Sequence, residues 1–255
     1  MTHPIKPVIS TVFFPVTDLK ASIEWYANLF EQPIRPDKTG GGIYWGVSFD
    51  GTGIILDSNM WGFPPMIMFE SVRDIDASYE FCKGMDYSHI GELYRFSDVA
   101  HFNVGGNMVC WAISHEQPQE PAGDAHPLLT KISRVIAHGD NAAETENWYA
   151  GFLQKDVRPD PVVQGLNGIA MDKGADLLVD DNRLSQSGKV YYEKLQLNLH
   201  VAPALVIDSP DVEAARAHVS AKEALDVTGI EVRMGAACFT FHDPYGNGIM
   251  VRQTR

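Results

Sequence analysis

Long apolar runs are missing from this sequence. No stretch reaches the roughly 18 consecutive apolar residues that a membrane-spanning helix needs, and the opening residues, MTHPIKPVIS, contain no apolar segment of signal-peptide length. Cysteine is also scarce: Cys82, Cys110 and Cys238 are the three in 255 residues, and none forms a CxxC pair. These absences indicate a cytoplasmic protein that is not held together by disulfides.

Basic residues are outnumbered by acidic ones. The chain has 20 lysines and arginines against 33 aspartates and glutamates, which gives a formal net charge of -13. Phosphate backbones and anionic lipid surfaces attract basic faces, so neither nucleic acid nor a membrane is expected as a partner. Hydrophobic residues make up 45% of the chain, enough for the cores of two ordinary domains. We expect the partner to be a small molecule.

An internal repeat organises the chain. Residues 25–37 read WYANLFEQPIRPD and residues 148–160 read WYAGFLQKDVRPD, with six of thirteen positions identical at an offset of 123. The offset rises to 138 where Pro65 matches Pro203, because the second copy carries an insertion, the polar stretch at 183–197, which we expect to be a longer loop. Self-similarity over such a length predicts two tandem copies of one domain.

A shorter repeat lies within the first copy. DLKASIEWY at Asp18 and DIDASYEFC at Asp74 agree in step, and weaker counterparts start near Asn141 and Asp211. Each begins with a residue that can cap a helix, followed by apolar residues at helical spacing. β-Branched and aromatic runs flank these helices, and IYWGVSFD and GTGIILDS form a predicted hairpin. Each quarter of the chain therefore reads as β-α-β-β-β.

These patterns predict an α+β fold class. The two predicted domains cover residues 1–114 and 131–255. Residues 115–130, which are Pro-rich, polar and without periodicity, form the predicted linker between them.

Three segments carry a family resemblance. VFFPVTDLKASIEWYANLF, GTGIILDS and the closing FTFHDPYGNGIMV resemble the glyoxalase, bleomycin-resistance and extradiol-dioxygenase superfamily, also called the vicinal-oxygen-chelate superfamily. In the DPYGN turn, Pro244 fixes φ while Gly246 and Asn247 tolerate positive φ, so two strands can reverse tightly. The first copy has a decayed form, HFNVGGNMVCW. The resemblance implies tandem domains in which paired βαβββ units form a curved, cup-like mixed sheet. It leaves the activity open, since this superfamily includes isomerases, dioxygenases, transferases and drug-binding proteins.

The resemblance also implies where a metal would be held. Metal-dependent relatives place ligands on the first strand, on the fifth strand and just after the closing turn. The corresponding positions are Thr11, near Pro65 and Cys110 in the first copy, and Arg134, near Pro203 and Met250 in the second. Proline offers no side-chain ligand, and the Arg134 guanidinium would repel a cation. We therefore expect no metal cofactor; a divalent metal held by displaced ligands is the alternative.

Strand alternation predicts which side chains face the inside of each cup. The candidate ligand-binding residues are Thr11, Phe13, His101, Asn103 and Cys110 in the first copy, and Arg134, His138, Thr240, His242 and Met250 in the second. Arg134 would bind a carboxylate or phosphate of the ligand through two hydrogen bonds. Each residue type also has a structural interpretation: hydrogen-bonded histidines of a half-wet sheet, an inert buried thiol, and a surface arginine paired with a carboxylate. No catalytic residue is identified.

The sequence thus predicts a glyoxalase/bleomycin-resistance-like protein that binds a small molecule in the concave faces of its sheets without a metal. It would act either as a binding protein or as a metal-independent enzyme. Two alternatives remain: a metal-dependent lyase or dioxygenase with displaced ligands, and a non-catalytic assembly module. Because a fused tandem can pair its domains within one chain, we expect a monomer or a homodimer.

Overall fold

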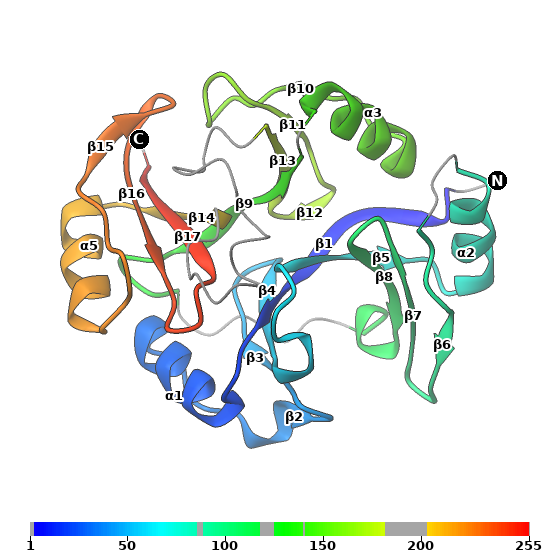
Figure 1. The fold of residues 1–255 in the computed structure, drawn as a ribbon, viewed down its shortest axis with the longest axis horizontal. Helices are drawn as coiled ribbons and strands as arrows, with labels where there is room; N and C mark the ends of the chain where they lie inside the picture. Colours follow the sequence, from blue (N-terminus) through cyan, green and yellow to red (C-terminus); the bar gives the residue numbers. More distant parts are fainter. Residues whose placement is uncertain (1–2, 86–88, 118–124, 140, 182–202, 255) are drawn as a thin grey trace.

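Two curled mixed sheets, one from each half of the chain, dominate the structure. The computed structural model describes residues 3–85, 89–117, 125–139, 141–181 and 203–254. Figure 1 shows the four helices of this part on the outside of the two sheets, so that the helix-free faces are the concave ones. The predicted α+β class, with two tandem glyoxalase-like domains, is confirmed.

The elements of the first half are β1 (Ile5–Pro15), α1 (Leu19–Phe30), η1 (Pro36–Lys38), β2 (Thr39–Gly40), β3 (Ile43–Val47), β4 (Gly53–Asp57), η2 (Ser58–Met60), β5 (Met66–Ser71), α2 (Ile75–Lys83), β6 (Tyr94–Arg95), β7 (Val99–Val104), β8 (Asn107–Ala112) and η3 (Ile113–His115). Those of the second half are β9 (Lys131–His138), α3 (Ala142–Leu153), β10 (Arg158–Pro159), β11 (Asn167–Ile169), β12 (Lys173–Gly174), β13 (Asp176–Asp180), β14 (Pro203–Ser209), α5 (Val212–Ala221), β15 (Glu231–Arg233), β16 (Ala236–His242) and β17 (Gly248–Gln253).

The predicted repeat is present in the topology. The strand orders β2-β3-β4-β1-β5-β8-β7-β6 and β10-β11-β13-β9-β14-β17-β16-β15 correspond one to one. Each quarter runs β-α-β-β-β, and the third has one additional short strand, β12, which pairs with β1 of the first half. Helices α1 and α3 begin and end 123 residues apart. They have matching N-caps, Asp18 and Asn141, and matching left-handed C-caps, Glu31 and Gln154. The predicted loop at 183–197 and the middle of the predicted linker, 118–124, lie outside the described residues.

Alternation along the strands separates one large core from two small apolar clusters. Phe102 and Val109 of the first sheet and Phe241 and Ile249 of the second join a single core that both halves share beneath the helices. The alternate residues point to the concave faces, where each sheet has its own cluster. The two domains are therefore packed as one body, with two separate inner faces.

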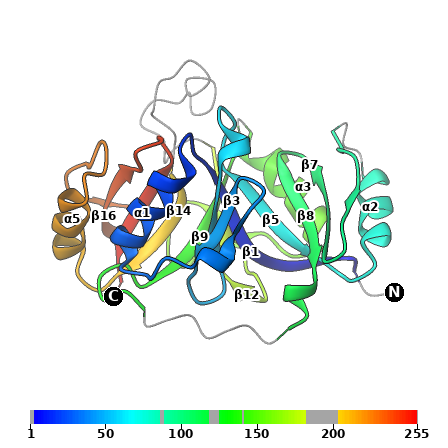
Figure 2. The same ribbon diagram turned by 90° about the horizontal axis from the view of Figure 1, so that it is seen from below.

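The halves exchange contacts at several points. Strand β12 of the second half pairs with β1 of the first, with Ile9 opposite Gly174. Figures 1 and 2 show α1 beside α5 and β16, where Trp25 Nε1 donates to the Lys222 carbonyl at 2.8 Å. Asn247, in the DPYGN turn, donates from Nδ2 to the Pro15 carbonyl at 3.0 Å. The closing turn of the second half thus supports the first strand of the chain.

No helix in the described ranges is long and apolar enough to cross a bilayer.

Candidate functional site

The concave face of the first sheet, here called the first cup, is lined by apolar and sulfur-containing side chains. Phe13, Met66, Met68 and Cys110 are buried in one cluster, against which half-buried residues pack: Ile55, Met60, Val99, Met108 and Ala112. The predicted Thr11, Phe13 and Cys110 lie on this face. His101 and Asn103 join them, because His101 is paired with Cys110 and Asn103 with Met108 across β7 and β8.

The first cup keeps its cysteine protonated. Burial, and to a smaller extent the neighbouring Glu70 carboxylate, raise the pKa of the Cys110 thiol to about 12. A thiol with such a pKa is a poor nucleophile at neutral pH, because the thiolate is the reactive form. Burial also lowers the pKa of the His101 imidazole, which is therefore neutral at pH 7.

The concave face of the second sheet, the second cup, is filled by the chain itself. Val163 and Leu166, from the loop after β10, pack in one cluster with Ile136, Leu178, Val206, Cys238 and Met250. The space left beside Val162, Met234 and Met250 is about 10 Å³. That is the volume for one water molecule at most. The predicted Met250 lies on this face but is 4% exposed.

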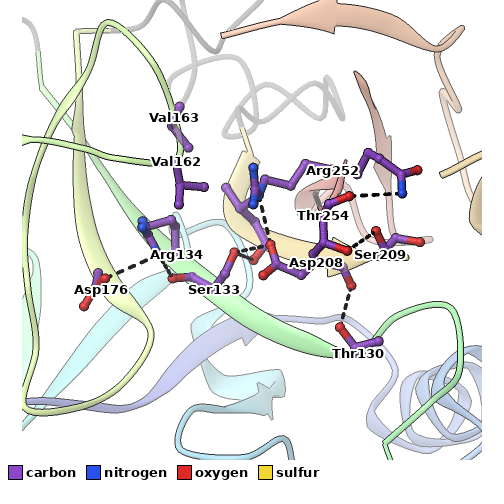
Figure 3. Close-up of polar contacts among 12 residues, drawn as sticks. Thr130, Ser133, Arg134, Val162, Val163, Asp176, Asp208, Ser209, Arg252 and Thr254 are labelled. Carbon is purple, nitrogen blue, oxygen red and sulfur yellow. Dashed lines mark hydrogen bonds and ion pairs between the residues drawn. The ribbon is translucent and has the colours of Figure 1, made fainter. Parts of the chain in front are cut away.

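The predicted Arg134 holds this filling loop in place. Its Nε donates to Asp160 Oδ2 at 2.6 Å, and the Asp160 Oδ1 atom accepts the backbone N–H groups of Val162 and Val163. Arg134 Nη1 also lies 3.3 Å from Asp176 Oδ2 (Figure 3). Arg134 is therefore paired with carboxylates, as in the structural interpretation, although it is buried rather than at the surface. A ligand contact of Arg134 stays a prediction.

The remaining predicted residues of the second copy are also held by the protein. His138 Nδ1 lies 3.1 Å from Asp180 Oδ2, and its Nε2 lies 2.8 Å from the Pro203 carbonyl. His242 Nδ1 lies 3.3 Å from Asp226 Oδ2. Thr240 shares the His242 face of β16, opposite the buried Phe239 and Phe241. The structure brings the five residues of each copy onto one face, as the alternation predicts.

The positions that hold a metal in metal-dependent relatives need one correction. The fifth-strand residue opposite the first-strand position lies three residues beyond the predicted proline in each copy: Thr11 pairs with Met68, and Arg134 pairs with Val206. The donor sets are then Thr11, Met68 and Cys110 in one cup and Arg134, Val206 and Met250 in the other. A hydroxyl, a thioether and a protonated thiol do not fit a hard divalent cation, and neither does a set that contains a guanidinium.

A His/His/carboxylate cluster lies elsewhere, where α1, α5 and the segment before β9 meet. Ligand atoms of Glu31, His126 and His218 lie within 4.8 Å of one another, so the cluster could hold a metal ion. His218 Nε2 donates to the Leu29 carbonyl at 2.8 Å, which leaves its Nδ1 available. His126 Nδ1, however, accepts the N–H groups of Leu128 and Leu129, so the proton of the neutral ring is on Nε2. A metal would have to displace that proton.

A polar cleft between the domains has a volume of about 240 Å³. Its charged lining consists of Asp50, Lys131, Arg134, Lys173 and Asp176. Since Asp160 already neutralises Arg134, the two lysines and two aspartates balance, and the cleft favours no charge of ligand.

Sequence reasoning did not identify several polar residues of the first cup: Lys6, Glu70, Tyr94 and His115. The signal that could have found Glu70 is its alternation with Met66 and Met68 once β5 is correctly placed.

Comparisons with known proteins find the fold in enzymes. No protein-family model and no curated protein matches the chain. The 2,3-dioxygenase LapB from Pseudomonas sp. KL28 matches 100% of this chain and 93% of its own, with a TM-score of 0.57 and 13% identity. A catechol 2,3-dioxygenase matches 98% of this chain and 88% of its own, with a TM-score of 0.61 and 14% identity. The 2,2',3-trihydroxybiphenyl 1,2-dioxygenase from Sphingomonas wittichii RW1 matches 98% of this chain and 91% of its own, with a TM-score of 0.56 and 13% identity. Over its full length the chain has the tandem fold of the extradiol dioxygenases of the vicinal-oxygen-chelate superfamily.

Proposed function

We propose that this chain binds one small apolar molecule in its first cup without a metal, either as a binding protein or as a metal-independent enzyme. The observation that carries the proposal is the difference between the two cups. In the second, Val162 and Val163 turn inward and fill the concave face. The matching residues of the first copy, 123 positions earlier, are Thr39 and Gly40, which are exposed in β2 and pair with β3. The first cup therefore keeps half-buried apolar side chains on its concave face.

The lining of the first cup supports an apolar ligand. Four methionines lie on it, Met60, Met66, Met68 and Met108. Methionine side chains are unbranched and polarisable, so they adapt to the shape of a ligand and make favourable contacts with aromatic rings. Small-molecule sites are usually apolar concave surfaces with a few polar groups, and the first cup has this composition.

A fluorescent apolar probe tests the proposal. We expect the neutral fluorescent probe 1-anilinonaphthalene to bind the purified chain with a stoichiometry near one, and Met108→Lys to weaken that binding about tenfold or more by placing a charge on the apolar face. Met234→Lys makes the same change at the second cup and is the matched control, which should leave binding unchanged. Equal binding by both variants would contradict the proposal, as would no binding by the parent chain. A bound ligand will also raise the melting temperature in a screen of small molecules.

The second candidate, a metal-dependent lyase or dioxygenase with displaced ligands, rests on the Glu31, His126 and His218 cluster. Glu31 follows α1 and His218 lies on α5, so the cluster is on the helix side of the sheets, away from both cups. Elemental analysis of chain purified without chelator distinguishes the candidates. One equivalent of a transition metal, lost in Glu31→Gln and His218→Ala, would favour the second.

The pairing of the domains within one chain supports a monomer as the working form. Light scattering at micromolar concentration tests this part of the proposal, with a homodimer as the alternative outcome.

A further inference from the structure

A row of polar side chains crosses the first cup from one edge of the sheet to its middle. Tyr94 on β6 pairs with His101 on β7, and His101 pairs with Cys110 on β8. Cys110 pairs in turn with Glu70 on β5, whose Oε2 lies 3.5 Å from Lys6 Nζ. Paired residues of neighbouring strands share a face, so the row lies on the concave side with Met66 and Met68.

Glu70 is buried with spare hydrogen-bonding capacity. Its side chain is 8% exposed, and Lys6, at 3.5 Å, is the one donor to it among the described residues. A carboxylate can accept about four hydrogen bonds, and a buried one is costly when they are not made. Because little water reaches Glu70, a ligand that donates a hydrogen bond to this carboxylate would satisfy it and would bind more tightly as a result.

Two imidazole nitrogens beside the row are also unsatisfied. The Nδ1 atoms of His101 and His115 are buried, and neither has a hydrogen-bond partner in the part of the chain that the structure describes. Burial lowers the pKa of both rings; for His115 the Glu70 carboxylate partly opposes this effect, and Lys6 adds to it. Both rings are neutral at pH 7, so each Nδ1 can donate or accept according to its tautomer.

The charges of the row already balance. Glu70 is matched by Lys6, and the two histidines are neutral. A charged group of a ligand would lose its hydration here without meeting an unmatched opposite charge. A neutral hydroxyl, which both donates and accepts, suits a carboxylate beside a neutral imidazole.

The edge of the row favours a flat ring. The Tyr94 and Phe96 rings stack on the His101 ring, with centroid distances of 5.5 and 6.2 Å. Both remain largely in contact with solvent, at 50% and 63% exposure. A planar ligand would cover them and extend over the methionines of the floor.

Resting on the proposed function of the first cup, we infer that the row of Glu70, Cys110 and His101 selects a neutral, planar, apolar molecule that carries a hydroxyl group. The hydroxyl donates to the Glu70 carboxylate and hydrogen-bonds a histidine Nδ1, while the body of the ligand lies on Tyr94, Phe96 and the methionines.

Three molecules with one skeleton test the inference: 2-naphthol, naphthalene and 2-naphthoate, with affinities measured by fluorescence titration. We expect 2-naphthol to bind about tenfold more tightly than either of the others, the effect of one hydrogen bond to a charged group. Glu70→Gln, which keeps the shape of the side chain, and His101→Phe, which keeps the ring stack, should each reduce that preference severalfold. Glu231→Gln, at an exposed carboxylate of β15, is the control and should leave it unchanged.

The outcomes separate the inference from the proposed function. Equal binding of 2-naphthol and naphthalene would overturn the inference and leave the proposed function standing, as would a preference unaffected by both row variants. Binding by none of the three, together with no binding of the anilinonaphthalene probe, would overturn the proposed function itself. If Glu70→Gln does not fold, His101→Phe alone decides the role of the row.

Discussion

The Tyr26 hydroxyl donates to Asp243 Oδ2 at 2.8 Å, although the two residues lie 217 positions apart and belong to different domains. Asp243 also accepts the N–H groups of Tyr245 and Asn247, so a buried carboxylate organises the whole DPYGN turn. Burial raises the pKa of Asp243, and these hydrogen bonds oppose that rise; burial and the nearby Asp243 raise the pKa of Tyr26. The matching contact of the other helix is neutral: the Tyr149 hydroxyl donates to Asn107 Oδ1 at 2.9 Å.

Removing these two hydroxyls should have unequal effects. We expect Tyr26→Phe to lower the free energy of unfolding by about 1.5–3 kcal/mol, because its hydrogen bond is to a charged group, and Tyr149→Phe by about 0.5–1.5 kcal/mol. Urea denaturation of both variants at pH 7 measures the difference. A larger loss of unfolding free energy for Tyr149→Phe would show that the charge of Asp243 does not strengthen the contact between the domains.

The close approach of Gly51 to Gly174 gives a second prediction about the contact between the two domains. A Cβ on Gly51 would lie 2.5 Å from the Gly174 Cα atom, whereas one on Gly41 would meet nothing within 4 Å; both glycines have positive φ, +92° and +57°. Gly51→Ala therefore adds a backbone clash to the strain of φ, and we expect it to cost about 1–3 kcal/mol more than Gly41→Ala. Thermal unfolding of the pair tests this. Similar losses would mean that the β1–β12 pairing can move apart without cost.

Local signals were enough to predict the repeat and its helices. Asp18 and Asn141 cap their helices from the adjacent residues, so the 123-residue offset could be read without any tertiary information. The register of β5 could not be read in this way. It depends on irregularities in β1, where the pairing shifts between Ile9 and Thr11, and such shifts are set by contacts between strands. Glu70 was missed for this reason.

The sequence also could not predict that a loop fills the second cup. Val162 and Val163 come shortly after strand β10 (Arg158–Pro159), and nothing in the sequence indicates that their side chains point inward. Their position depends on the ion pair between Arg134 and Asp160, which are 26 residues apart in the chain. Strand alternation was enough to predict the face of the sheet on which each candidate site residue lies. It could not predict that a loop of the same chain covers that face in the second cup.

Acid should weaken the fold through its buried histidines. Burial lowers the pKa of His126, His101 and His115 below the value of about 6.5 that a histidine has in the unfolded chain. The unfolded chain then binds more protons, so stability is fully present above pH 6.5 and is lost as the pH falls below it. His126→Asn keeps an acceptor for the N–H groups of Leu128 and Leu129 but cannot titrate. We expect it to lose less stability than the parent between pH 7.5 and 5.5 in urea titrations; an equal loss would exclude His126 as a source.

The buried arginine should matter for stability. We expect Arg134→Met to cost about 3–5 kcal/mol, because it leaves the Asp160 carboxylate buried without its cation. Arg158→Met is the matched control, since Arg158 and Asp156 are each 77% exposed, and it should change the free energy of unfolding by less than about 1 kcal/mol. If Arg134→Met were as stable as the parent but lost affinity for inorganic phosphate, a role in binding an anionic ligand would be favoured instead.

The support that Asn247 gives to Pro15 has a consequence for how the chain is made. The first strand obtains this hydrogen bond from a residue 232 positions later, in the last tight turn of the sequence. During synthesis the amino-terminal domain therefore emerges from the ribosome long before its own packing can be completed. Its first helix can pack on β3 and β4 of the same domain at once, but Trp25 and Tyr26 lack their partners Lys222 and Asp243 until nearly the whole polypeptide has been translated. A nascent chain stopped after the first repeat would leave these partners missing and the interface with the second domain open to chaperones and proteases.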